Sequence, residues 1–177
     1  CRTHSSGHHG EQEPWSFGDE VIDITRKFVE LRYQLLPYLY TMFWQYVNDG
    51  VPMLKPLVYF DQNDIQTHYR TDEFIFGNQI LVCPILEPNA LGRRMYLPEG
   101  NWYNYWTNEL VKGKKELWVA TDFDQIPIFV KEGAIIPKYP VQQYVGQIES
   151  PDLTLDVYFK LGKEKSYVYE DAQDGYD

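Results

Sequence analysis

Apolar residues recur at intervals of three and four between positions 21 and 35, which is the spacing of one buried stripe along an α-helix. The stripe consists of Val21, Ile24, Phe28, Leu31 and Leu35. Ser16 and Asp19 are candidate N-caps for this helix. Pro37 cannot donate a backbone hydrogen bond, so a kink or a split is predicted there before the helix resumes and ends at Gly50.

After residue 50 the pattern changes to short apolar runs separated by turn residues. The runs cover residues 53–60, 74–76, 79–86, 93–97, 102–106, 117–120, 126–130 and 134–137. Because no helical periodicity separates them, they predict an antiparallel sandwich. The expected fold class is therefore mainly β: an antiparallel β-sandwich preceded by a long kinked helix.

The strongest alternation of apolar and polar residues lies near the C-terminus, after a polar linker at residues 138–146. Its apolar positions are Leu153, Leu155, Val157 and Phe159. This period of two predicts a strand, and a turn at 161–164 leads to a second run at 166–170. Since a lone two-stranded hairpin is marginal in water, we expect this hairpin to be the start of a further domain.

Composition excludes several classes of function. The 177 residues are 44% hydrophobic, enough for a core, and carry a net charge of −10, which disfavours nucleic acid and anionic membranes as partners. The longest uncharged run, 33–48, is shorter than the roughly 20 residues that a membrane span needs. No signal-peptide pattern is seen, and two cysteines are too few for a disulfide framework, so the compartment stays open.

Candidate chemistry gathers in the first fifteen residues, which contain three histidines, an arginine and two glutamates with little to bury. Such a segment is the rim of a site or a solvated loop. His4, His8, His9 and Glu11 are donors that zinc accepts, but their spacing fits no metal motif, so we expect no metal and no cofactor. Glu11 and Glu13 have no opposing carboxylate, and nucleophilic serine motifs are absent. The segment therefore has parts of a site without a reactive centre.

Several motifs resemble glycoside hydrolase family 31. Those near the N-terminus are Arg2-x-His4, Glu11-Gln-Glu-Pro-Trp15-x-Phe17-Gly18 and Leu31-Arg-Tyr-x-Leu-Leu-Pro-Tyr-Leu-Tyr-Thr41, similar to the family's last barrel strand and helix. Later matches lie within residues 50–57, 74–84, 96–103 and 126–137. The order and spacing over some 135 residues make the resemblance specific, whereas the match in the tail, at 169–175, is weaker.

The resemblance implies retaining α-glucosidases and α-xylosidases built on a (β/α)8 barrel followed by two β-domains. Residues 1–50 would be the end of the truncated barrel, 51–139 the proximal β-sandwich, and 140–177 a linker and the start of the distal β-domain.

The same resemblance implies that His4 hydrogen-bonds the sugar in the −1 subsite, while Arg2 and Glu13 orient it from behind. The family's two catalytic aspartates belong to earlier barrel strands, so no catalytic residue is expected in this chain. We therefore expect a fragment of a retaining α-glucosidase that acts on terminal α-glucosidic bonds in oligosaccharides, inactive by itself.

Two alternatives stay open at this point. The parent protein could be an α-xylosidase, since pocket residues upstream decide that specificity. Residues 51–139 could instead be a carbohydrate-binding module that stacks sugars on Trp102, Tyr103, Tyr105 and Trp106, although a structural brace is favoured. In either case apolar surface left without a partner predicts self-association.

Overall fold

A computed structural model of the chain describes residues 10–171. Arg2 and His4 lie outside the described residues. The helices are η1 (Pro14–Phe17), α1 (Asp19–Gln34), α2 (Leu36–Asp49), α3 (Leu57–Phe60) and η2 (Ile65–Thr67). The strands are β1 (Leu54–Pro56), β2 (Phe74–Phe76), β3 (Ile80–Val82), β4 (Gly92–Leu97), β5 (Asn101–Asn104), β6 (Leu110–Lys112), β7 (Lys115–Ala120), β8 (Ile128–Lys131), β9 (Ile135–Lys138) and β10 (Thr154–Val157). Within residues 10–171, no helix is long and apolar enough to cross a membrane.

The predicted helix is present and is split next to Pro37. Leu35 separates α1 from α2, and Pro37 stands in the first turn of α2, where a missing N–H costs no helical hydrogen bond. Gly50 ends α2 in the left-handed conformation, at φ 69°, as expected. The expected caps were wrong, because Gly18 is the N-cap of α1 and Ser16 lies in η1.

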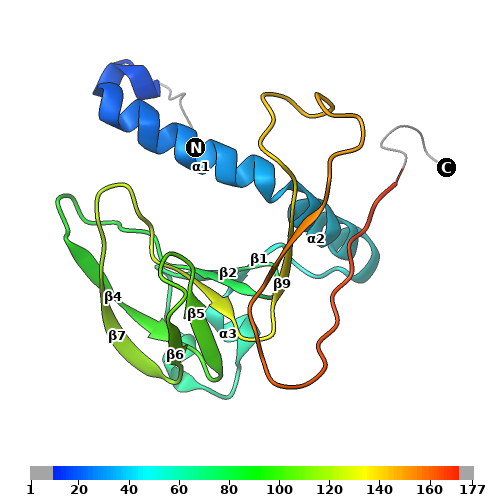
Figure 1. Ribbon diagram of the computed structural model, residues 1–177. Coiled ribbons are helices and arrows are strands. Elements are labelled where there is room, and N and C mark those ends of the chain that lie inside the picture. The colour runs from blue at the N-terminus through cyan, green and yellow to red at the C-terminus, as the bar shows by residue number, and fades with distance from the viewer. Residues whose placement is uncertain (1–9, 172–177) are drawn as a thin grey trace.

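A six-stranded antiparallel sheet, in the order β1-β2-β3-β8-β5-β6, forms the centre of the molecule (Figure 1). The β4–β7 pair covers one of its faces, where Leu81 and Phe129 pack against Met95. On the other face, Ile80 and Val130 pack with residues of α2 and β9. The antiparallel sandwich after a kinked helix is thereby confirmed. Burial on both faces explains why β3 and β8 read as continuous apolar runs.

Tyr38 joins helix α2 to the sheet by a hydrogen bond and a ring contact. Its hydroxyl donates to the Phe76 carbonyl at 2.9 Å, and the two rings meet edge to face with centroids 5.9 Å apart. Burial raises the pKa of Tyr38 well above its usual range, so the phenol stays protonated as a donor. Gly77 lies under this contact at φ +66°, and a Cβ there would be 2.3 Å from both Met42 Sδ and Tyr38 Oη.

Replacing Gly77 by alanine should therefore lower the free energy of unfolding by about 2–3 kcal/mol, from positive-φ strain and overlap with α2. Gly50→Ala is the matched control, since Gly50 has a similar φ of +69° with nothing within 4 Å of the added Cβ. It should cost about 1 kcal/mol. Urea unfolding of both variants measures the difference, and equal losses would show that the Gly77 contact with α2 contributes nothing.

Two local expectations for the sandwich were wrong. Residues 53–60 were expected to be one strand, but only β1 is extended, and Leu57 begins the single helical turn α3. Leu57 is fully buried in this helical turn, where it packs in the core with Ile75 of β2. This burial outweighs the local preference of the segment for a strand. Strand β6, which pairs with β5, was not expected.

The tail differs from the expected hairpin. The strand itself is present as β10, but its partner is β9, and no strand forms at 166–170. Asp156 points to Lys138 and forms an ion pair with it, so the apolar residues Leu155 and Val157 are half or more exposed. Self-association through such exposed apolar side chains stays a prediction.

Candidate functional site

The described part of the candidate rim is residues 10–15. It precedes α1, at the end of that helix that lies farthest from α2 (Figure 1). Glu13 is the one predicted site residue that the structure places. Its carbonyl accepts from the Ser16 N–H at 2.9 Å and its carboxylate from the Gln12 N–H at 3.1 Å. Both bonds are local: the first closes the turn at the start of η1, and the second holds the carboxylate against the preceding backbone.

The rim and the 3-10 helix η1 that continues it expose aromatic rings beside carboxylates. Trp15 is 68% and Phe17 61% exposed, and Glu11 accepts a hydrogen bond from the Ser16 hydroxyl at 3.3 Å. Aromatic faces with carboxylate acceptors nearby suit a polyhydroxylated ligand or a partner surface. Among the described residues, no group of three His, Cys, Asp or Glu side chains could hold a metal ion.

A polar and aromatic contact joins α1 to the sandwich. Lys27 Nζ donates to both the carbonyl and the carboxylate of Asp124, at 2.9 Å and 2.6 Å. The same ammonium group lies 4.7 Å from the centre of the Trp106 ring. Phe28 meets Trp106 edge to face, with centroids 6.2 Å apart. Trp106 is held in turn by its indole N–H, which donates to the Ile126 carbonyl at 2.7 Å. The sandwich thereby fixes the helix that follows the candidate rim.

The other three aromatic residues of the suggested stacking platform are also used internally. Trp102 is fully buried in the sandwich core. Tyr103 donates its hydroxyl to the Phe159 carbonyl at 2.7 Å, and the Tyr105 hydroxyl accepts from Lys138 Nζ at 2.9 Å. Since these rings face the core, the tail and β9, the four residues do not form one exposed platform. Their contacts are those of a structural brace.

A buried polar cluster, which the sequence pattern did not indicate, lies between β4 and the sheet. The Glu73 side chain is inaccessible to solvent, and both carboxylate oxygens accept from the Tyr96 N–H at 3.1 Å. Cys83 Sγ lies 3.3 Å from the same carboxylate, and Arg70 lies 3.6 Å away. Burial raises the pKa of Glu73, although the contacts with Tyr96, Cys83 and Arg70 each act to lower it. Burial, together with the neighbouring Glu73 carboxylate, raises the pKa of the Cys83 thiol. Because Glu73 and Cys83 are buried and their partners are other residues of the sandwich, the cluster ties β4 to the segments that carry Arg70, Glu73 and Cys83.

The chain matches two family models in the order in which a barrel and its following domain occur. Residues 1–42 match the TIM-barrel domain of glycosyl hydrolases family 31, and residues 50–136 match the C-terminal domain of the same family. The fold and these matches define a glycoside hydrolase segment in which a β-sandwich follows the end of a barrel. The chain belongs to glycoside hydrolase family 31.

Curated relatives include α-glucosidases and an α-xylosidase. Alpha-glucosidase 2 of Bacillus thermoamyloliquefaciens is 36% identical over 172 residues, which are 96% of this chain and 22% of the relative. The alpha-xylosidase of Saccharolobus solfataricus is 38% identical over 71% of this chain and 17% of its own length. This chain therefore spans about a fifth of these relatives.

Solved structures agree in fold. A Flavobacterium johnsoniae GH31 dextranase, solved with isomaltotriose, superposes with a TM-score of 0.83 at 36% identity, over 86% of this chain and 19% of that one. The GH31 α-xylosidase of Xanthomonas citri gives a TM-score of 0.82 at 28% identity, over 87% of this chain and 17% of its own. The fold is thus one that solved family members share over more than four fifths of this chain.

Proposed function

We propose that this chain is part of a retaining α-glucosidase that hydrolyses terminal α-glucosidic bonds in oligosaccharides by double displacement. The observation that carries the proposal is the match to an α-glucosidase over 96% of this chain. The barrel and C-terminal family models also match consecutive parts of the chain, at residues 1–42 and 50–136. In this proposal residues 1–50 complete the barrel, 51–139 form the proximal sandwich, and 140–177 begin the distal β-domain.

Within that enzyme, His4 would hydrogen-bond the sugar, and Arg2 and Glu13 would orient the segment around it. Placement of the segment after the last barrel strand fits the rule that barrel active sites lie at the carboxyl ends of strands. The contact of Lys27 with Asp124 and Trp106 supports the proposal, because it ties the helix behind this segment to the sandwich. The sandwich would then act as a brace for the pocket wall.

By itself the chain should not catalyse. The family's nucleophile and acid/base aspartates match no residues here, so incubation with nitrophenyl α-glucoside should release no nitrophenol above a buffer blank. Turnover that disappears in the His4→Ala variant would contradict the assignment of roles, because it would require a complete catalytic centre within these residues.

The second test extends the chain upstream. Sequence encoded before Cys1 is expected to contain a Trp-x-Asp segment and a later Gly-Asp segment, which would carry the two catalytic aspartates. The longer protein should then cleave nitrophenyl α-glucoside with retention of configuration at the anomeric carbon. NMR of the sugar released at early times measures that configuration. Inversion of the anomeric configuration, or absence of both segments, would contradict the proposed function.

An α-xylosidase is the second candidate. The observation in its favour is the α-xylosidase relative, which at 38% is slightly more identical than the α-glucosidase, although over a shorter part of this chain. The longer protein assayed with nitrophenyl α-xyloside and α-glucoside in parallel decides between them by the ratio of kcat/KM values.

A further inference from the structure

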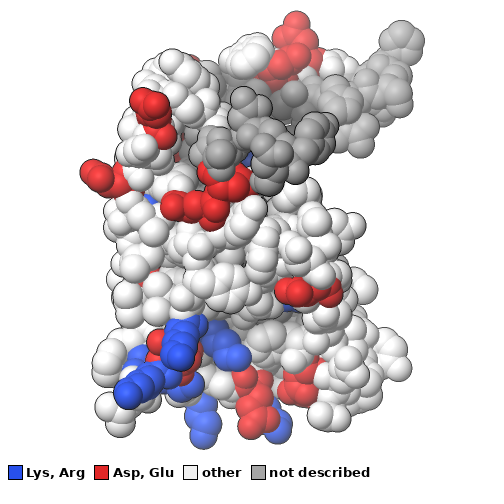
Figure 2. All heavy atoms as spheres, turned by 90° about the vertical axis from the view of Figure 1, so that its right-hand side faces the viewer, with Lys and Arg blue, Asp and Glu red and all other residues white. Residues whose placement is uncertain are grey.

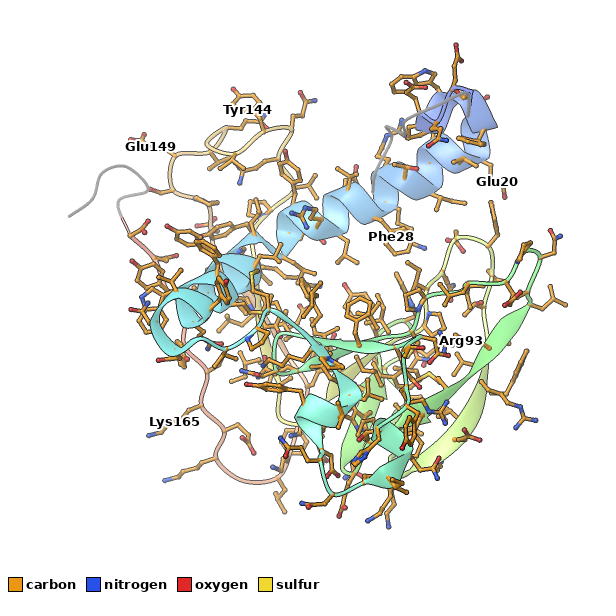
Figure 3. The ribbon with its side chains drawn as sticks, turned by 180° about the vertical axis from the view of Figure 1, so that it is seen from behind. Glu20, Phe28, Arg93, Tyr144, Glu149 and Lys165 are labelled. Carbon is orange, nitrogen blue, oxygen red and sulfur yellow. The ribbon has the colours of Figure 1, made fainter. Side chains whose placement is uncertain are left out.

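A cleft of about 530 Å³ lies between the first turn of α2, the loop that follows β9 and the segment 169–171. Its volume is within the range of small-molecule sites. Figure 3 shows Tyr144 and Glu149 on this loop, at the opposite end of α1 from Glu20 and hence from the candidate rim. The residues that matter for its chemistry are Tyr40, Tyr139, Glu149, Tyr169, Glu170 and Asp171.

Aromatic rings form one side of the cleft in a fixed arrangement. The rings of Tyr40 and Tyr169 are tilted by 41°, with centroids 5.7 Å apart. Trp44 stacks behind Tyr169 at 5.2 Å, and the Tyr169 N–H donates to the Thr41 hydroxyl at 3.0 Å. Because the rings are already held by α2, a ligand would find an apolar wall without first ordering it.

Hydroxyl and carboxylate groups line the same space. The Tyr40 hydroxyl donates to Asp171, and the Tyr139 hydroxyl donates to Glu170 at 3.0 Å. Its bond to Asp171 raises the pKa of Tyr40, and burial with the Glu170 bond raises that of Tyr139. Both phenols therefore stay protonated at neutral pH. Glu149 has no hydrogen-bond or ion-pair partner among the described residues, so its carboxylate can accept donors from a ligand.

Charge restricts the class of ligand. Among residues 10–171, three carboxylates and no lysine or arginine line the cleft. Figure 2 shows acidic side chains over the upper part of this face, and basic ones gathered at its lower end. Anions are excluded by repulsion. The walls also include Leu36, Pro37, Val145, Ile148 and Pro151, which favour a ligand with apolar faces as well as hydroxyls.

We propose that this cleft is a saccharide-binding site, in which a neutral sugar ring packs on Tyr40 and Tyr169 and donates hydroxyl hydrogens to Glu149 and Glu170. Sugars combine an apolar face with a rim of hydroxyls, which is what the aromatic wall and the carboxylates complement. The inference goes beyond the proposed function and does not depend on it, since no residue of the candidate rim lines the cleft.

Titration of the chain with maltotriose tests this inference. Trp44 stacks on the back of Tyr169, so binding should give a saturable change in tryptophan fluorescence that is missing in Trp44→Phe. Tyr40→Ala and Glu149→Gln should each weaken binding about tenfold, through a lost ring face and a lost charged acceptor. Tyr144→Ala is the matched control, because Tyr144 is 62% exposed on the same loop and does not line the cleft.

Other results overturn the inference. No saturable response to maltotriose, or equal affinity in Tyr40→Ala, Glu149→Gln and the parent chain, would exclude the cleft as its site. A response to spermidine without one to maltotriose would assign the carboxylates to a cation. Binding abolished by His4→Ala but unchanged by Tyr40→Ala would place the sugar at the candidate rim. That result would support the proposed function while overturning this one.

Discussion

Replacement of Trp102 by alanine should lower the free energy of unfolding by about 3–5 kcal/mol, the usual cost of emptying a large aromatic site in a core. Trp102 is fully buried, packs with Phe60 at a centroid separation of 5.7 Å, and donates its indole N–H to the Pro98 carbonyl at 3.0 Å. The variant therefore creates a cavity and removes one of the two donors to the Pro98 carbonyl, which keeps the Lys114 N–H at 3.2 Å. Urea unfolding followed by circular dichroism measures the loss.

Trp118→Ala provides the control for this experiment. Trp118 has the same side chain on β7 but is 60% exposed, so its removal should cost less than about 1 kcal/mol. Since native domains are stable by only about 5–15 kcal/mol, the Trp102 variant should be close to unfolding at 37 °C and the Trp118 variant should not. Similar losses in both would mean that the sandwich core is not the one described.

Removal of the buried carboxylate is the second large effect. Glu73→Ala should lower the free energy of unfolding by about 3 kcal/mol, because the Tyr96 N–H loses its acceptor and Arg70 loses a buried counter-charge. Arg70 keeps its ion pair with Glu116, which limits the loss. Chemical unfolding at pH 7 measures it, and a change within error would show that water replaces the carboxylate freely.

The same residue should make stability depend on pH. Burial raises the pKa of Glu73 above its ordinary 4.5, so the folded state holds this proton more tightly than the unfolded state. The contribution of Glu73 to stability is therefore greatest below pH 4.5 and falls as pH rises from there, until the folded-state carboxyl is ionised.

Glu73→Gln removes that titration but keeps an oxygen for the Tyr96 N–H. Relative to the parent chain, its stability should improve as pH rises from 4 to 7. Glu99→Gln is the control, since it makes the same replacement at an exposed position, where Glu99 pairs with Lys114. Parallel profiles for the parent chain and Glu73→Gln would show that burial does not shift the titration of Glu73.

Much of the fold followed from local pattern. The helical stripe and Pro37 predicted a split helix, and the split occurs at Leu35 because proline is tolerated in the first turn of the second helix. Most strands followed from short apolar runs. Residues 57–60 were misassigned, because burial of Leu57 outweighs the strand preference of this segment. Pairing of β10 with β9 was missed because strand partners are chosen by the whole fold.

The two candidate sites differ in how far sequence could find them. His4, Arg2 and Glu13 came from a motif contiguous in sequence, and only Glu13 lies in the described structure. The cleft could not be found that way, because Tyr40, Glu149 and Tyr169 come from a helix, a loop and the tail. The buried cluster around Glu73 was missed for the same reason, since Cys83 and Tyr96 meet it from different strands.

The sequence alone determined most of the elements, the mainly β class and, by its motifs, the family, because periodicity and contiguous motifs are properties of neighbouring residues. Only the tertiary structure decided which strand pairs with which and which face of β10 is exposed. It also brought carboxylates and tyrosines from distant segments into one cleft. Those outcomes depend on packing and desolvation between residues far apart along the chain, and such energies exist only once the chain has folded.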